Sequence, residues 1–419
     1  MKSNYRRIGD FIKLVDVRNK DLRVTKLLGL SISKEFIPSV ANTIGTNMAK
    51  YKIIKKNQFA CSIMQVRRDK KMPIALLKEF DKAIISQAYP VFEVINTDEL
   101  LPDYLMMWFS RSEFDRHACF LAVGGVRGSL EWEDFLDMEL PVPSIEKQHE
   151  IVKEYNTIVN RISLNETLNQ KLEETAQALY KHWFLDFEFP NAEGKSYKSS
   201  GGKMVFNKEL DMEIPLGWEV SDLSKITKKV FSGGTPRTSE KNYWGNEFYW
   251  LSSGETRDIV IIDSERMITQ NGVDNSSTKL ALIGDTIIAS AGQGKTRGQA
   301  SFCGINTYVN QSVLCIRPKN ESYKSFVFFH LRSKYNELRN ESDAQSIRGS
   351  LNKDNISNLS ILIPKEDVLK KYENIGTAIL NKIILNRKIS KELDDLASTI
   401  LSKMSKVETK TVAVKAYEI

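Results

Sequence analysis

Val126-Arg127-Gly128-Ser129-Leu130 recurs as Ile347-Arg348-Gly349-Ser350-Leu351, a shift of 221 residues along the chain. The same shift, without a gap, relates matched positions on both sides of this block. Arg111-Ser112 matches Arg332-Ser333, Leu164-Asn165 matches Leu385-Asn386, Leu172 matches Leu393, and Ala176 matches Ala397. A five-residue match arises easily by chance, but one constant shift along the chain indicates an internal duplication. Two equivalent modules can present two similar surfaces to one partner, which suits the recognition of two separated stretches of a polymer.

Length and composition limit the class of protein. The 419 residues suffice for two or three domains with separate cores, and 41% hydrophobic and 27% charged residues are ordinary for a globular chain. A formal net charge of +7 permits a polyanionic partner without requiring one. No segment approaches the roughly 20 apolar residues that cross a bilayer, and no signal peptide is evident. We therefore expect a cytoplasmic protein, and the widely spaced Cys61, Cys119, Cys303 and Cys315 favour reduced thiols without structural zinc.

Two long helices are the strongest structural prediction. Pro143 and the capping Ser144 begin a run without proline or glycine that continues to Phe189, with apolar residues every three or four positions. Pro364 repeats Pro143, and a second such helix is expected over 366–405. A helix of about 40 residues spans roughly 60 Å.

Each helix carries an apolar seam with near-heptad spacing and therefore needs a partner. The simplest partner is the other helix, in an antiparallel coiled coil where Asn165 and Asn386 meet at the centre and fix the register. In the alternative, each helix packs on its own domain and the asparagines point to water. The residues expected to pair the helices are Ile158, Ile162, Asn165, Leu172, Ile379, Ile383, Asn386 and Leu393.

The remaining blocks mix short β-type runs, such as 91–95 and 286–289, with helical stretches. The predicted fold class is α+β, with two repeated α+β domains separated by two long helices that form the antiparallel coiled coil. The expected boundaries are 1–143 for the first domain, 144–189 for the central helix, 190–215 for an irregular Gly/Ser-rich linker, 216–363 for the second domain, 364–405 for the distal helix and 406–419 for a tail.

Basic side chains in the first domain are candidates for DNA binding. Arg67, Arg68, Lys70 and Lys71 follow a predicted strand, and with Lys55 and Lys56 they could neutralise several phosphates. The alternative is a solvated loop without a partner.

Turns of the second domain combine cations, amides and aromatic rings. Arginine can recognise guanine, and asparagine or glutamine can recognise adenine, in the major groove. Gly292-Gln293-Gly294-Lys295-Thr296 ends like a nucleotide-binding P-loop, but Ala289 stands where that motif needs its first glycine, which favours contact with a backbone phosphate instead. The candidate residues are Thr235, Arg237, Tyr243, Trp244, Gln293, Lys295, Arg297 and Asn310.

Recognised catalytic signatures are missing from the sequence. We find no Gly-x-Ser-x-Gly elbow, no Asn-Pro-Pro-Tyr methyltransferase signature and no dinucleotide fingerprint, and the four histidines lack metal-ligand spacing. The sequence therefore predicts no catalytic residue and no metal site. Two other classes remain open: a nuclease or methyltransferase with a cryptic active site in one α+β domain, and a coiled-coil assembly protein without a role in DNA binding.

Several motifs in a fixed order resemble the DNA-specificity subunit of type I restriction–modification systems, over nearly the whole chain. They are Ser232-Gly233-Gly234-Thr235-Pro236, Tyr243-Trp244, Gly284-Asp285-Thr286 followed by Asn310-Gln311, the two Arg-Gly-Ser-Leu blocks, Trp183-Phe184-Leu185-Asp186-Phe187 and Ile214-Pro215-Leu216-Gly217-Trp218. The first domain departs from the pattern because it lacks the Gly-Thr-Pro and Tyr-Trp signature. Its recognition surface is therefore the less defined of the two.

The resemblance implies a bipartite DNA reader without an active site or cofactor of its own. Each α+β domain would be a target-recognition domain for one half of a split site in double-stranded DNA, and the helices would set the unread gap. The helices would also dock two modification subunits, which use S-adenosylmethionine to methylate adenine. Restriction subunits, which use ATP and magnesium, are optional further partners.

Overall fold

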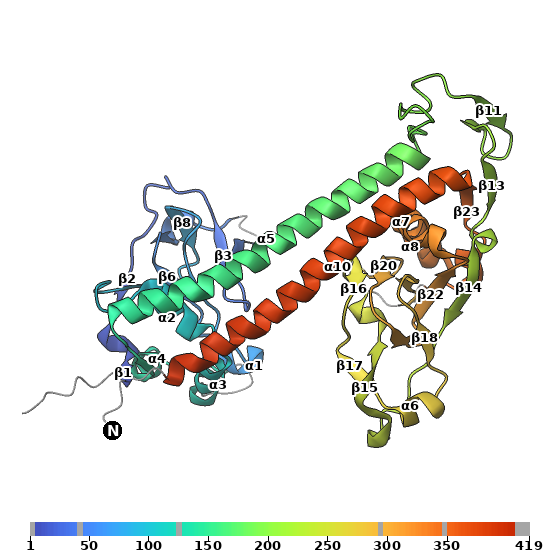
Figure 1. Ribbon diagram of the computed structural model, residues 1–419. Helices are drawn as coiled ribbons and strands as arrows, with labels where there is room; N and C mark the ends of the chain where they lie inside the picture. Colours follow the sequence, from blue (N-terminus) through green and yellow to red (C-terminus); the bar gives the residue numbers. More distant parts are fainter. Residues whose placement is uncertain (1–4, 40–44, 123–127, 292–295, 346–349, 407–419) are drawn as a thin grey trace, which may run out of the picture. The chain divides into compact units, whose positions relative to one another are not determined.

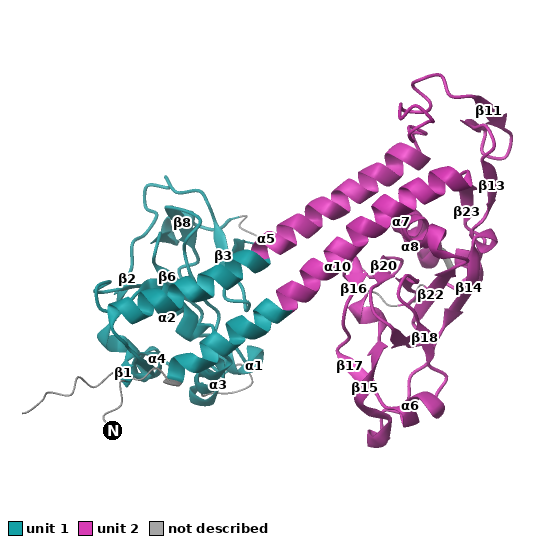
Figure 2. Cartoon of the chain, viewed as in Figure 1, with its two compact units in different colours: residues 1–162, 392–419 teal, residues 163–391 magenta. Residues whose placement is uncertain are grey.

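The computed structural model describes residues 5–39, 45–122, 128–291, 296–345 and 350–406. The chain divides into two compact units, and each is described by itself (Figure 2). Unit 1 contains residues 1–162 and 392–419, and unit 2 contains residues 163–391. Both long helices contribute to both units, so each unit holds one α+β module and a paired stretch of the two helices.

The two long helices are α5, Ile145–Phe184, and α10, Glu366–Lys403, which lie side by side (Figure 1). The hydroxyl of Ser144 accepts the amide of Lys147 at 3.4 Å, as expected for the residue that caps α5. α5 ends at Phe184, five residues before the expected Phe189. The reason is local: Phe187 adopts a left-handed φ of +61°, and the amides of Asp186 and Glu188 turn back to carbonyls in the last helical turn.

Within unit 2 the helices pack antiparallel through two equivalent hydrogen bonds. Asn165 donates to Ser390 Oγ at 3.1 Å, and Asn386 donates to Asn169 Oδ1 at 2.9 Å. Asn169 and Ser390 are 221 residues apart, so the duplication relates the two bonds. The prediction that the two asparagines pair with each other is wrong, because the centre of the pair lies two residues beyond each of them.

The other residues expected to pair the helices lie along the same seam. Ile158 and Ile383 are buried, and both asparagines are only 2% exposed. Partly buried side chains that pack against the two main cores are those of Ile162, Leu172, Ile379 and Leu393. The prediction of an α+β protein with two repeated domains and two long paired helices is confirmed.

Unit 1 is built on a four-stranded sheet of order β2-β9-β6-β7. Phe59 and Phe92 stack across neighbouring strands at 5.0 Å, and Phe109 and Phe135 pack on them. The end of α10 enters the same core through Ala397, Ile400 and Met404. The strands are β1 Tyr5–Arg7, β2 Ile12–Val15, β3 Leu28–Leu30, β4 Phe36–Pro38, β5 Lys52–Lys55, β6 Phe59–Cys61, β7 Ile74–Leu76, β8 Lys82–Ile85, β9 Val91–Val94 and β10 Glu139–Pro141. The helices are α1 Val66–Asp69, α2 Pro102–Phe109, α3 Ser112–Leu121 and α4 Trp132–Asp137.

Unit 2 contains a five-stranded sheet of order β14-β22-β19-β20-β16 and a four-stranded sheet of order β17-β15-β21-β18. Its core joins the apolar α7 to aromatic residues of both long helices, including Tyr180, Phe184 and Tyr372. The strands are β13 Glu219–Asp222, β14 Thr227–Ser232, β15 Trp244–Leu251, β16 Val260–Ile261, β17 Arg266–Ile268, β18 Lys279–Ala281, β19 Thr286–Ala289, β20 Ala300–Cys303, β21 Thr307–Val309, β22 Val313–Pro318 and β23 Ser360–Ile363. The helices are α6 Gln270–Asp274, α7 Lys324–Ser333, α8 Tyr335–Gln345 and α9 Lys353–Ser357.

The segment expected to be an irregular linker contains an antiparallel hairpin of β11, Met204–Asn207, and β12, Met212–Pro215. The Asn207 side chain accepts the amides of Glu209 and Leu210, each at 3.0 Å, and so closes the turn. Its glycine- and serine-rich composition concealed this short pairing.

The duplication is visible in where elements begin. α4 and α9, β10 and β23, and α5 and α10 each begin 221 residues apart. The repeat is therefore most regular around the entry into each long helix. Among the described residues, no helix combines the length and apolar character needed to cross a membrane.

Candidate nucleic-acid interface

The basic cluster of unit 1 lies on the connection between β6 and β7, which includes the short α1. The side chains of Arg67, Arg68, Lys70 and Lys71 are all exposed. Arg68 is partly neutralised, because its Nε donates to Asp69 at 2.7 Å. Lys55 and Lys56 are exposed at the turn between β5 and β6. This part of unit 1 presents cations without burying them.

The repeated Arg-Gly-Ser-Leu block packs directly against this basic connection. Leu130 donates its amide to Ile63 O at 2.9 Å, and Arg67 donates its amide to Gly128 O at 3.3 Å. Gly128 has a φ of +44°, and a Cβ there would lie 2.5 Å from Arg67 Cβ. Only glycine fits this close approach without strain. Val126 and Arg127 lie outside the described residues.

The second copy of the block makes the equivalent contact in unit 2. Leu351, which repeats Leu130, donates its amide to Ser290 O at 2.8 Å, and Ser350 forms a β-bridge with Ala291. Both partners lie on the connection between β19 and β20. Each block therefore acts as a strap on a loop that carries candidate DNA-binding residues. Two of those candidates, Gln293 and Lys295, lie outside the described residues, as do residues 347–349 of the second block.

Arg297, also on the β19–β20 connection, is a cation of the interior. Its side chain is 4% exposed and forms an ion pair with Asp343 of α8. A guanidinium held in this way joins the loop to α8 and is not presented to solvent.

The Ser-Gly-Gly-Thr-Pro turn of unit 2 lies against the segment that follows β21. Gly233 donates its amide to Asn310 O, and Gly234 donates its amide to Val309 O, each at 3.1 Å. A Cβ on Gly233 would lie 1.9 Å from Val309 O, so this approach requires glycine. The exposed Thr235 hydroxyl donates to Gln311 Oε1 at 2.7 Å. The buried side chain of Asn310 accepts the amide of Ser312.

Two tryptophans connect this turn to β15 and β17. Trp244 donates its indole N–H to Arg237 O, and Trp250 donates its own to Gly234 O, each at 3.2 Å. The exposed guanidinium of Arg266 stacks 3.5 Å above the Trp244 ring. Tyr243 and Trp244 are half-buried, and Arg237 is exposed. Arg266 was missed in the sequence because Glu265-Arg266 has the composition of an ordinary solvated turn.

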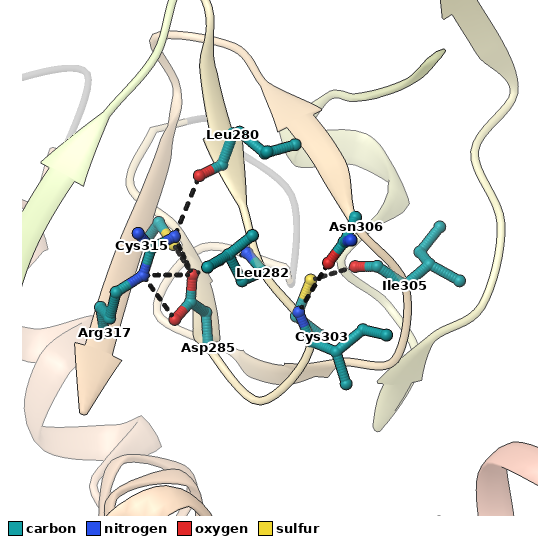
Figure 3. Close-up of polar contacts among 9 residues, drawn as sticks. Leu280, Leu282, Asp285, Cys303, Ile305, Asn306, Cys315 and Arg317 are labelled. Carbon is teal, nitrogen blue, oxygen red and sulfur yellow. Dashed lines mark hydrogen bonds and ion pairs between the residues drawn. The ribbon is translucent and has the colours of Figure 1, made fainter. Parts of the chain in front are cut away.

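The Gly284-Asp285-Thr286 motif has a structural role (Figure 3). Asp285 is 3% exposed and accepts hydrogen bonds from Arg317 Nη2 at 2.7 Å, the amide of Leu282 at 2.8 Å and the thiol of Cys315 at 3.3 Å. The hydrogen bond with Asp285 raises the pKa of Arg317. This network ties the turn before β19 to β22.

Burial in unit 2 favours the uncharged forms of two cysteines and one histidine. Burial raises the pKa of the Cys303 and Cys315 thiols, which keeps them protonated and unreactive. Burial lowers the pKa of His330 to about 3, and its Nδ1 lies 2.9 Å from the Tyr180 hydroxyl. Within the ranges that the structure describes, no group of three or more His, Cys, Asp or Glu residues is placed to hold a metal ion.

Comparison with known proteins assigns the family. The model described as the type I restriction modification DNA specificity domain matches residues 2–174 and again residues 215–396. The chain belongs to this family. The two matches cover most of both halves of the specificity chain, as the internal duplication requires.

Relatives of the specificity family match over much of the chain. The type I restriction enzyme MjaIX specificity subunit of Methanocaldococcus jannaschii is 26% identical over 318 residues, which are 74% of this chain and 70% of that protein. The HindI specificity subunit of Haemophilus influenzae is 22% identical over 405 residues, 84% of this chain and 86% of that protein. The crystal structure of a type I S subunit from M. genitalium covers 96% of this chain and 95% of its own, with a TM-score of 0.59 and 14% identity, and therefore shows a common fold. The chain is a type I specificity subunit, and none of these findings supports the alternative of a nuclease or methyltransferase.

Proposed function

We propose that this specificity subunit recognises a bipartite target in double-stranded DNA with two target-recognition domains, residues 1–143 and 216–363. The helix segments 144–189 and 364–405 separate the domains and dock two modification subunits. The chain has no active site. The modification subunits supply S-adenosylmethionine and methylate adenine in the cytoplasm, and restriction subunits with ATP and magnesium are optional.

One observation carries the recognition part of this proposal: each unit holds one loop with its own copy of the Arg-Gly-Ser-Leu strap. Leu130 on Ile63 and Leu351 on Ser290 make the same hydrogen bond in the two units. A strapped loop keeps exposed side chains in a fixed geometry, which lowers the entropy lost when they bind a duplex. Duplicated loops of this kind suit two similar contacts with one polymer.

The proposed contacts divide into two kinds. Exposed lysines and arginines of unit 1, at 55, 56, 67, 68, 70 and 71, would bind phosphates and position the domain. In unit 2, Thr235, Arg237, Tyr243, Trp244 and the stacked Arg266 surround one turn and are placed for contact with base edges. Gln293 and Lys295 remain proposed contacts, whereas the buried Arg297 and Asn310 would support the loops that touch DNA.

The length of the helices supports their role as a spacer. A helix of the length of α5 spans about 60 Å, which exceeds one duplex turn of roughly 34 Å. We propose that this length sets the number of base pairs between the two half-sites.

A domain exchange tests the proposal. Residues 216–363 would be replaced by the equivalent segment of another specificity subunit, and methylated adenines would be mapped in cells that express the hybrid with its modification subunit. One half-site should change while the other half-site and the gap remain. A change in both half-sites, or in neither, would contradict the assignment of the domains. Purified specificity subunit alone should neither cleave nor methylate DNA, and turnover by the chain alone would favour the enzyme alternative.

A further inference from the structure

Arg111 and Arg332 are related by the duplication, but their surroundings differ. Arg111 follows α2 in unit 1, and Arg332 lies in the last turn of α7 in unit 2. Each of the two arginines lines a pocket. Phe114 and Tyr335, which line the two pockets, are also related by the shift of 221. The two pockets share these two equivalent positions, and their other lining residues differ.

In unit 2 the arginine is paired with a carboxylate from the same chain. Arg332 Nε donates to Glu173 Oε1 of α5 at 2.9 Å, and Nη2 donates to the same oxygen. Arg332 Nη1 donates to Ala300 O at 2.8 Å. The guanidinium is thus fixed by a glutamate that the neighbouring long helix provides.

In unit 1 the equivalent carboxylate is one methylene shorter. The position of Glu173 corresponds to Asp394 of α10. Burial raises the pKa of Asp394, and the neighbouring Asp395 raises it further, which is the direction opposite to that of an aspartate held by an arginine. Among the described residues Arg111 has its ion pair with Glu113 and none with Asp394, so it lacks there the pairing that Glu173 gives to Arg332.

Arg111 is buried and incompletely paired. Its side chain is 4% exposed and stacks 4.1 Å from the Trp108 ring. Among the described residues its Nε has no hydrogen-bond partner, and the Glu113 carboxylate lies 3.6 Å away. A buried guanidinium that lacks a hydrogen-bonded carboxylate is costly, and this favours a ligand that supplies one.

The groove beside Arg111 has room for such a ligand and restricts what it can be. Its cavity is about 540 Å³ and is also lined by Trp108, Phe114 and Ser405, which lies in the 3-10 turn that follows α10. Glu113, Asp137 and Glu139 line the same cavity, so a free anion would meet repulsion. A folded partner can overcome this, because it can present one carboxylate together with cations that face the acidic rim.

We propose that this groove docks a modification subunit, which inserts an aspartate or glutamate side chain that pairs with Arg111 as Glu173 pairs with Arg332. The inference rests on the proposed function, because that function brings a modification subunit to the long helices. The inference adds the chemistry of one contact, which is a carboxylate bound by an arginine. The modification subunit provides this carboxylate to Arg111 in unit 1, whereas Glu173 of the same chain provides it to Arg332 in unit 2. The two partner sites of the specificity subunit are therefore unequal.

The test compares variants of the full chain mixed with purified modification subunit, with the stoichiometry read by native mass spectrometry and the affinity by titration. Arg111→Met keeps most of the side-chain volume without the charge. It should weaken the binding of one of the two copies by roughly 10- to 100-fold, the effect of losing a charged hydrogen bond. Arg116→Met is the matched control, because Arg116 is an exposed arginine of α3, the helix that begins directly after Arg111. Equal affinity for both copies in Arg111→Met would overturn the proposal.

Two further variants keep the result clear if Arg111→Met disturbs folding. Asp394→Glu places a glutamate at the position that corresponds to Glu173. It should raise the melting temperature and weaken one copy, because the longer side chain then pairs with Arg111 as Glu173 pairs with Arg332, and unchanged binding would count against the proposal. Removal of residues 407–419 should leave both copies bound, whereas loss of one copy would assign the groove to the chain's own tail. If the unaltered chain recruited no modification subunit, the proposed function itself would fail.

Discussion

Neutralising the basic loop of unit 1 should change how salt affects DNA binding. Arg67, Lys70 and Lys71 are exposed on one strapped loop, so replacing all three with glutamine removes up to three phosphate contacts. Each contact contributes about 0.9 to the slope of log affinity against log salt, so the slope should fall by about 2.7. Between 50 and 200 mM salt, the affinity of the variant should then drop about 40-fold less than that of the unaltered chain.

The assay is fluorescence anisotropy of the complex with its modification subunits, on a duplex with the mapped target and on a scrambled duplex. Because phosphate contacts carry no sequence information, the ratio of the two affinities should stay nearly constant. The matched control replaces Lys198, Lys203 and Lys208, which are exposed residues outside both α+β domains, and should keep the original slope. An unchanged slope in the loop variant would refute the assignment of this loop to the DNA backbone.

Three other perturbations test the helix pair and the core. Ile383→Ala should lower the free energy of unfolding by about 2–5 kcal/mol, because this side chain is fully buried. Leu385 is half-exposed, so Leu385→Ala should change the free energy of unfolding by no more than about 0.5 kcal/mol. Chemical denaturation measures both values, and equal effects would contradict the assignment of Ile383 to the buried side of α10. Burial lowers the pKa of His330 to about 3 in the folded chain, whereas an unfolded histidine has a pKa of about 6.5. The unfolded chain therefore binds a proton first as the pH falls below about 6.5, and the free energy of unfolding should drop by about 2 kcal/mol between pH 7 and pH 5. The drop should be clearly smaller in His330→Gln. Four residues inserted after Thr167 and four after Lys388 lengthen the paired helices by about 6 Å, so the target gap should grow by about two base pairs with both half-sites unchanged. Altered half-sites would show that the helices are not the spacer.

The sequence was sufficient to predict the duplication and the helix pair, because heptad spacing and caps are local signals. It was not sufficient to place the centre of the pair. The shift of 221 relates Asn165 to Asn386 wherever the pseudo-twofold axis lies, and only the packed seam decides that each bonds to the residue four positions after the other.

The candidate site was predictable as a set of residue types but not as an arrangement. The strap on the basic loop joins Leu130 to Ile63, a pairing between distant parts of the chain that leaves no local signal. Arg297 was predicted as a surface cation because its loop is rich in glycine, yet Asp343, far along the chain, holds it in the interior. Arg266 was missed because Glu265-Arg266 has the composition of a solvated turn, and the Trp244 ring on which it stacks comes from another strand.

Mapping methylated adenines in the source cell, with and without this gene, tests the central claim most directly. The account predicts a methylated motif of two short specified segments separated by an unspecified gap, and predicts that the motif vanishes from the genome when the gene is removed. Methylation that persists without the gene, or a gene-dependent motif that is one continuous segment, would contradict the account of two reading domains on one duplicated chain.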